Sequence, residues 1–301
     1  MGQYEHLLDM KNRLNMNMGE YNMNKVTNSV KDSTFKAHYI NGYLEPKRFI
    51  ICDSPTLAEM NQFIESVVSS NVAIIVSMEA LEQSYLPRNM NQSRSFCDGR
   101  YKLRLIASGR FKGGYNSSLL KVYDEKTGKQ RKILHLQYLG WPDSDVPSCR
   151  DFVSFVKTVK LNRTVLSGGY MANDSFCPIM VHSSLGRNRC NTFITLDIML
   201  SKLAHIKHQY NSVSEYFINS TPGFSLTQTV LAVHVQHPSC LLSPLSYLFI
   251  CLALIEEIVK LGMTKKHNGF SLRSYTVPGE FSPMRSSEMV KASFTQLTNP
   301  R

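Results

Sequence analysis

The sequence has no long hydrophobic run and no apolar segment near its start. Its most apolar stretch, residues 240–255, contains Pro244 and continues into Glu256 and Glu257, so it predicts a buried helix and not a membrane span. The first residues are polar and lack the apolar core of a secretory signal peptide. His6 stands where an N-myristoylation motif needs Ser or Thr. We therefore expect a cytoplasmic protein that neither enters a membrane nor is secreted through a signal peptide.

The cysteines lack the spacing of a metal site or a disulfide framework. There are seven, an odd number, and no two of them form a CxxC pair. This pattern argues against a zinc ribbon and against a small secreted fold held by disulfides, and it favours reduced thiols in a cytosolic setting. The sequence therefore predicts no metal and no cofactor.

Positive charge is abundant but it is not concentrated. The chain has 34 Lys and Arg residues against 23 Asp and Glu residues, which gives a formal net charge of +11. Such a balance favours anionic partners, including phosphorylated proteins. The basic residues are scattered and do not alternate with aromatic residues, so we do not expect a nucleic-acid-binding protein.

The apolar pattern predicts a mixed α/β fold. Short alternating or continuous apolar runs predict strands at residues 38–43, 48–53, 72–78, 102–108, 119–124, 131–139 and 178–183. Apolar residues at helical spacing predict helices at 57–68 (entered at Pro55), 151–160, 192–206, 229–236 and 246–261, of which 192–206 reads as strongly amphipathic. We expect a twisted mixed central sheet flanked by helices, an α/β (α+β) domain over residues 1–262, followed by a polar, disordered tail at 263–301.

The segment CPIMVHSSLGRNRCNTF, residues 177–193, has the layout of a phosphate-binding loop. A short apolar run ends at His182, and a polar loop containing Gly186 and Arg189 leads into a helical pattern. The backbone N–H groups of such a loop point inward, and the N-terminus of the following helix adds partial positive charge. The planar guanidinium group of an arginine binds two phosphate oxygens at once. The sequence therefore predicts an anion site here.

Two motifs carry a resemblance to a known family. HSSLGRNRCNTF resembles, position for position, the signature HCxxGxxR(S/T)GxF of the protein tyrosine phosphatases. The segment HLQYLGWPDSDVPS, residues 135–148, resembles the acid-bearing WPD loop of the same family. Three weaker matches appear in the family's order along the chain, at KNR (11–13), HYINGY (38–43) and SYLFICLALIEEI (246–258). The resemblance covers residues 11 to about 262.

The resemblance implies a fold, a chemistry and a set of site residues. In the family, a cysteine thiolate attacks phosphorus, an aspartate protonates the leaving group, and the loop holds the phosphate. Carried over to this sequence, the nucleophile position is Ser183 and the former general acid is Asp143. The phosphate-binding residues are Ser184, Leu185, Gly186, Arg187, Asn188 and Arg189, and the structural residues of the two loops are His182, Trp141 and Pro142.

Several family positions are altered. Ser183 replaces the cysteine, and an alcohol is too weakly acidic for the loop to ionise near neutral pH. Cys190 occupies the Ser/Thr position, which we place at the helix start and not at the loop floor. Asn188 replaces a loop glycine, a change expected to strain the backbone. Leu14 replaces the tyrosine that packs on the substrate ring, and Leu242 replaces the glutamine that positions water.

Three functional hypotheses follow. The first is an inactive phosphatase homologue that binds phosphotyrosine-containing proteins without hydrolysing them. The second is an interaction scaffold in which the phosphate loop is vestigial. The third, ranked last, is a weakly active tyrosine phosphatase with a serine nucleophile, for which a Ser183–His182–Asp143 triad can be drawn.

Among members of the family, the sequence is most similar to the tyrosine-phosphatase-like proteins of bracoviruses, the polydnaviruses carried by parasitoid wasps. The resemblance rests on the short length, the start rich in Asn, Met and Lys, and the HSS-type loop. It implies delivery into the cytoplasm of host insect cells and interference with immune signalling.

Overall fold

A computed structural model of the chain describes most of the predicted domain. The described residues are 25–26, 35–80, 85–143, 145–170, 177–184, 187–209, 223–237 and 242–263, without the side chains of 167–170 and 187. The predictions made for residues 11–14, for the loop residues Leu185 and Gly186, for the Arg187 side chain, and for the tail from residue 264 lie outside what is described.

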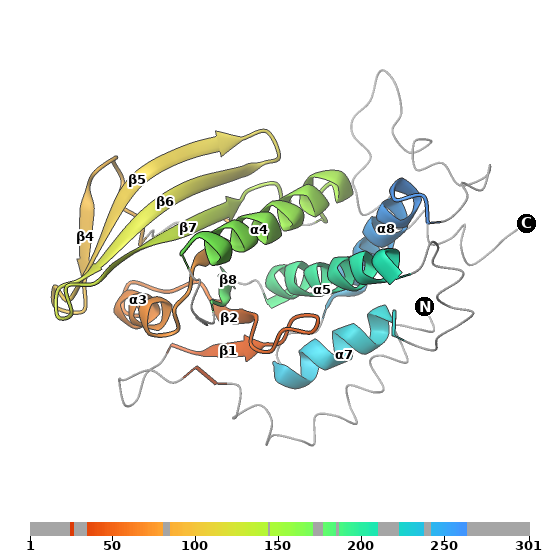
Figure 1. Cartoon of the computed structure of the whole chain (residues 1–301), viewed down its shortest axis with the longest axis horizontal. Helices are drawn as coiled ribbons and strands as arrows, with labels where there is room; N and C mark the ends of the chain where they lie inside the picture. The colour runs from red at the N-terminus through yellow and green to blue at the C-terminus, as the bar shows by residue number, and fades with distance from the viewer. Residues whose placement is uncertain are drawn as a thin grey trace, which may run out of the picture.

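A mixed sheet forms the centre of the described part of the chain (Figure 1). Its eight strands lie in the order β1-β2-β8-β3-β7-β6-β5-β4. The strands are β1 Ala37–Ile40, β2 Phe49–Asp53, β3 Ile74–Ser77, β4 Ser93–Phe96, β5 Tyr101–Phe111, β6 Tyr115–Asp124, β7 Gln130–Tyr138 and β8 Ile179–Ser183. Neighbours within β2-β8-β3-β7 are parallel, and the outer pairs are antiparallel. The predicted twisted mixed sheet flanked by helices is confirmed.

The two most apolar runs form the middle of the sheet. Every residue of β8 and of β3 is buried, and each strand lies between two parallel neighbours. Continuous apolar runs are typical of parallel strands covered on both faces. The predictions of buried strands at 72–78 and 178–183 are therefore confirmed, and they place the end of β8 at the carboxyl edge of the parallel strands.

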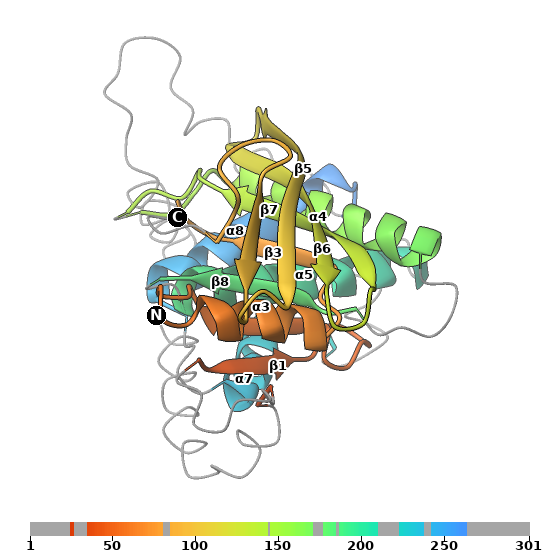
Figure 2. The same ribbon diagram turned by 90° about the vertical axis from the view of Figure 1, so that its left-hand side faces the viewer.

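Helices cover both faces of the sheet unequally (Figure 2). The helices are α3 Met60–Ser69, α4 Cys149–Tyr170, α5 Arg187–Gln209, α7 Leu226–Gln236 and α8 Pro244–Lys260. One core cluster joins α4, α5, α7 and α8 to the sheet, and a second joins α3 to the other face. Of the described helices, none has the length and apolar character needed to cross a lipid bilayer.

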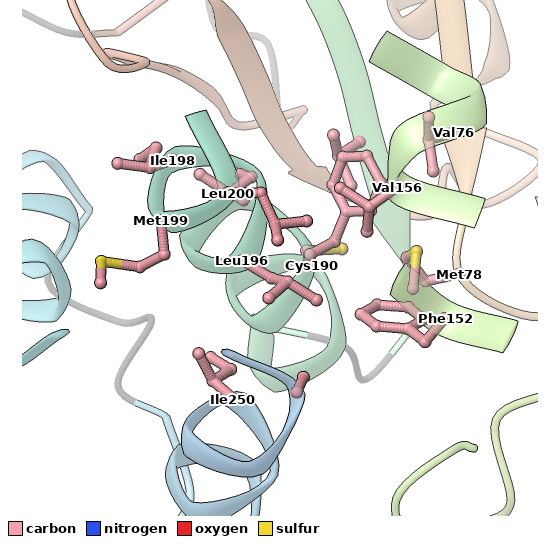
Figure 3. Packing of buried hydrophobic residues seen from close by; sticks show 14 of the residues in the cluster. Val76, Met78, Phe152, Val156, Cys190, Leu196, Ile198, Met199, Leu200 and Ile250 are labelled. Atoms are coloured by element: carbon pink, nitrogen blue, oxygen red, sulfur yellow. The ribbon is translucent and has the colours of Figure 1, made fainter. Parts of the chain in front are cut away.

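Helix α5 is the centre of the larger cluster. Residues 190–200 are all buried, and only the last turns of the helix alternate between buried and exposed residues. Figure 3 shows this helix with Phe152 and Val156 of α4 on one side and Ile250 of α8 on the other. The prediction of a strongly amphipathic helix is wrong for its first three turns, because α4, α8 and the sheet surround it.

Other details also differ from the sequence predictions, including α4, which spans Cys149–Tyr170 and not only 151–160. Strand β4 was not predicted, because only its last residue is buried and its sequence, SRSF, carries no apolar alternation. Strand β6 begins at Tyr115, earlier than the predicted residue 119. Helix α3 begins at Met60 and not at Pro55, since residues 56–59 form a turn in which the Glu59 carboxylate accepts bonds from Thr56.

Candidate phosphate-binding site

The candidate site lies at the carboxyl edge of the parallel strands. Strand β8 ends at Ser183, and helix α5 begins at Arg187, so the loop connects a buried strand to a helix N-terminus. Strand β3 lies beside β8 and ends at Ser77, and β7 lies on the other side of β3 and ends at Tyr138, with all three strands parallel. The segments after these strands, which carry Glu79 and Trp141, therefore meet the loop at one edge of the sheet.

His182 is fixed in the core by both of its ring nitrogens. Nδ1 lies 2.8 Å from the Ser54 hydroxyl, and Nε2 lies 2.8 Å from the Tyr85 hydroxyl. Burial, with a smaller contribution from nearby His135, lowers the pKa of His182 to about 3. The ring is therefore neutral and engaged on both sides, which is a structural role and not that of a general base.

Ser183 lies at the floor of the loop beside a thiol. Its side chain is buried, and its Oγ lies 3.2 Å from Sγ of Cys190. Burial raises the pKa of Cys190 to about 12, and the bond to Ser183 opposes this only in part. The expectation that Cys190 stands away from the loop floor is wrong. The first turn of α5 directs its side chain back toward Ser183 at the end of β8, because helical side chains lean toward the N-terminus.

Arg189 connects the loop to the segment after β7. Its guanidinium donates hydrogen bonds to the carbonyl oxygens of Met78 (3.4 Å) and Pro142 (3.3 Å), and it lies 3.5 Å from Oδ1 of Asp143. The same group lies 5.8 Å from the centre of the Trp141 ring. The fold thus brings together four residues that sequence reasoning had placed in one site.

The segment that carries Asp143 packs onto the Arg189 side chain. The indole N–H of Trp141 donates to the carbonyl of Asp145 at 3.0 Å, which closes a tight turn around Asp143. The Trp141 ring packs edge-on against Phe152 of α4. The Asp143 side chain is fully exposed, whereas the Arg189 side chain is 20% exposed. Asp143 is therefore solvated, and it forms an ion pair with Arg189.

Glu79 is a residue of the site that sequence reasoning missed. It follows β3, and its carboxylate accepts hydrogen bonds from the backbone N–H and the hydroxyl of Ser184. It also accepts one from the hydroxyl of Ser54 at 2.7 Å. A carboxylate thus already engages an N–H group of the loop that was predicted to bind an anion. Its position directly after a buried parallel strand was the one available signal, because such strands end at the same edge as β8.

Asn188 connects the loop to helix α8. Its side-chain amide donates to the hydroxyl of Ser246 at 2.9 Å and accepts from the backbone N–H of Ser243 at 2.9 Å. Its backbone belongs to α5 and is not left-handed, so the expected strain from a replaced glycine is absent at this residue. Leu242, at the expected water-positioning place, is buried in the core and presents no polar group.

The fold, the strand–loop–helix anion site and the Trp-Pro-Asp segment packed on its arginine together define one class of protein. The sequence profile of the protein-tyrosine phosphatase family matches residues 9–256, and the chain belongs to that family. Similar proteins include "Probable tyrosine phosphatase protein N1" of Microplitis demolitor bracovirus (isolate Webb), 26% identical over 80% of this chain and 73% of the relative. "Tyrosine phosphatase H3" of the same virus is 28% identical over 78% of this chain and 71% of its own length.

A cellular relative shows a similar degree of identity. The mouse protein "Tyrosine-protein phosphatase non-receptor type 9" is 24% identical over 75% of this chain, which corresponds to 37% of its own length. The predicted resemblance to the family and to its bracovirus members is confirmed.

Proposed function

We propose that this protein is a catalytically inactive tyrosine-phosphatase homologue. One observation carries the proposal: the hydroxyl of Ser183, at the nucleophile position, is hydrogen-bonded to a thiol and not to a histidine or a carboxylate in the described part of the chain. Its recorded side-chain partner is the Cys190 thiol, and both ring nitrogens of His182 are engaged elsewhere. A serine needs a general base to become a nucleophile near neutral pH. These contacts also argue against a Ser183–His182–Asp143 triad.

We further propose that the loop holds phosphotyrosine without cleaving it. Arg189 is kept at the loop by two carbonyl oxygens and remains partly exposed, so its fork is available to a phosphate. An alcohol in place of a thiolate also removes a negative charge that would repel a phosphate dianion. Both features favour phosphate binding by a loop that no longer catalyses hydrolysis.

Calorimetric titration with a phosphotyrosine peptide tests this proposal. We expect saturable binding by the parent and at least a roughly tenfold loss in Arg189→Ala, because charge-assisted hydrogen bonds contribute about 1.5–3 kcal/mol. Arg100→Ala is the matched control, since Arg100 pairs with Asp124 at the opposite end of the sheet. Equal binding of phosphorylated and unphosphorylated peptide, or equal loss in both variants, contradicts the proposal.

Glu79 favours a second candidate, an interaction scaffold with a vestigial loop. Its carboxylate already accepts bonds from Ser184, as a bound anion does, and its charge opposes a second anion. A parent that binds no phosphotyrosine peptide supports this candidate. Glu79→Gln then separates two causes: binding that appears in this variant identifies the carboxylate as the obstacle, and continued absence identifies a loop that has lost its function.

The third candidate, a weakly active phosphatase, is tested by turnover. Phosphate release from an aryl phosphate is measured for the parent and for Ser183→Ala. We expect no release above that of the alanine variant. A rate clearly above buffer that depends on Ser183 would falsify the proposed inactivity.

We infer a place of action from the viral relatives. Several of the similar proteins belong to a bracovirus, and this supports a role inside the cytoplasm of infected host cells, where phosphotyrosine proteins of immune signalling are available. Host phosphoproteins that are recovered with the parent and not with Arg189→Ala from insect-cell extracts support this role. Recovery that is the same with both proteins contradicts it.

A further inference from the structure

Three helices enclose a cavity at some distance from the phosphate loop. Helices α4, α5 and α8 pack against one another (Figure 1), and a cavity of about 470 Å³ lies between them. On α5 it borders residues from Asp197 to His208, whereas the loop leads into the other end of this helix at Arg187. Ten helical residues span about 15 Å, so the cavity is separate from the candidate phosphate-binding site.

Most of the cavity wall is apolar. It includes the buried side chains of Val156, Leu200 and Leu203. It also includes Ala204, which is exposed, and Leu261, which is half-buried. Leu200 and Ala204 are four residues apart on α5, so they lie one above the other on the same face of the helix. The wall therefore offers an apolar strip, and burying an alkyl chain against such a strip is favourable.

The two carboxylates that border the cavity are already paired. Asp197 forms an ion pair with Arg48 at 3.2 Å. Glu257 forms ion pairs with Lys157, which also borders the cavity, and with Lys260. The acidic groups of the wall are therefore neutralised from within the fold.

Two further lysines of the wall, Lys160 and Lys207, have no carboxylate partner in the described part of the chain. The ammonium group of Lys160 donates to the hydroxyl of Ser201 at 3.0 Å. The ammonium group of Lys207 donates to the carbonyl oxygen of Leu261 at 3.0 Å. Both acceptors are neutral, and an ammonium group has three N–H donors. The cavity therefore combines an apolar wall with two positive charges that can accept an anionic partner.

We propose that this cavity binds an alkyl chain that ends in a single anionic group, such as a fatty-acid carboxylate. The chain replaces water along the apolar wall, and the anionic group accepts hydrogen bonds from Lys160 and Lys207. This binding goes beyond the proposed function, and it does not depend on whether the phosphate loop holds phosphotyrosine.

The size and the chemistry of the cavity favour a small amphipathic ligand. Pockets for small molecules have volumes of about 300–1,000 Å³. A helix with its side chains is about 10–12 Å wide, so a single turn already fills roughly 500 Å³ and leaves no room for the helix of a partner protein. A wholly polar anion such as inorganic phosphate uses the two lysines but leaves the apolar wall in contact with water.

Filling the cavity gives the first test. The probe is dansylaminoundecanoate, whose fluorescence rises and shifts to shorter wavelength in an apolar site, titrated into the full chain. Ala204→Trp places an indole at the cavity wall. The matched control is Ala232→Trp, because Ala232 is also an exposed alanine inside a helix, α7, which does not border the cavity.

We expect saturable binding by the parent, at least a tenfold loss in Ala204→Trp and less than a twofold change in Ala232→Trp. Circular dichroism checks that both variants fold. Absence of saturable binding by the parent, or equal losses in the two variants, overturns the proposal.

Competition and charge removal give the second test, which does not depend on the tryptophan variants. Dodecanoate and dodecyl phosphate are expected to displace the probe, and the tighter of the two identifies the anionic group. Dodecanol should displace it at least tenfold more weakly. Lys160→Gln and Lys207→Gln should each weaken dodecanoate binding at least threefold, and Lys126→Gln, in the exposed turn between β6 and β7, less than twofold. Equal displacement by dodecanol, or equal losses in all three lysine variants, overturns the proposal.

Discussion

At the scale of single residues, serine and cysteine have exchanged places. The family signature has cysteine at position 183 and Ser or Thr at position 190, whereas this chain has Ser183 and Cys190. The two side chains still meet, with 3.2 Å between oxygen and sulfur. The thiol is therefore retained at the loop floor, but on the helix side, where burial raises its pKa to about 12 and keeps it protonated.

The exchange predicts that a single reversion does not recover a free nucleophile. In Ser183→Cys, two sulfur atoms occupy contacting positions, so we expect a disulfide to form in air, with a mass loss of about 2 Da that a reductant reverses. Mass spectrometry and thiol titration measure this. The double variant Ser183→Cys/Cys190→Ser is the control and should keep one thiol at position 183. A single variant that retains both free thiols after oxidation contradicts the prediction.

At the scale of elements, the loop is tied to α8 by one amide. The Asn188 side chain in α5 donates to Ser246 and accepts from the N–H of Ser243, the N-cap residue of α8. The N-terminal N–H groups of a helix need partners from outside the helix. The residue that replaced a loop glycine therefore joins two of the four helices of the larger core cluster, α5 and α8.

We predict that Asn188→Ala lowers the free energy of unfolding by about 1–2 kcal/mol, because two partly buried hydrogen bonds are lost. Urea denaturation measures this change. Asn162→Ala is the control, since Asn162 also lies inside a helix, α4, and its amide bonds within its own helix to the carbonyl of Thr158. A control that loses as much stability as Asn188→Ala would show that the link between α5 and α8 contributes nothing.

At the scale of the whole molecule, three of the buried histidines connect stability to pH. Burial lowers the pKa of His135 and of His182 to about 3, and burial together with Lys25 and Lys36 lowers the pKa of His38 to about 4. In the unfolded chain each imidazole binds a proton near pH 6.5. Below that pH the unfolded state holds more protons than the native state, so stability is complete above pH 6.5 and falls as the pH decreases toward the native pKa values.

We predict that the free energy of unfolding falls steeply from pH 7 to pH 5, with each buried histidine contributing up to about 1.4 kcal/mol per pH unit below pH 6.5. Urea midpoints at half-unit intervals measure the slope. In His135→Leu the slope should decrease by about a third, because one of the three groups is removed. His135 suits this test since its Nε2 has no hydrogen-bond partner among the described residues. An unchanged slope contradicts the assignment.

Much of the fold and part of the site could be predicted from the sequence. The continuous apolar runs determined the central strands, and helical spacing determined where α4, α5, α7 and α8 lie, because burial imposes a period on a chain whatever its partners are. The strand–loop–helix layout and the identity of Ser183 could also be read from the local sequence. The start of α3 could not, because turn geometry defines it. The existence of β4 could not, because it depends on pairing with β5.

Contacts between distant segments were decided only by the tertiary structure. Glu79 reaches Ser184 because β3 and β8 are parallel neighbours, and Cys190 reaches Ser183 because the first turn of α5 lies under the loop. Arg104, Lys121 and Lys132 come side by side because the register of three strands aligns them. The sequence determined which residues are buried and where the loop lies. Strand order and register determined which side chains meet, because these depend on the packing of the whole chain.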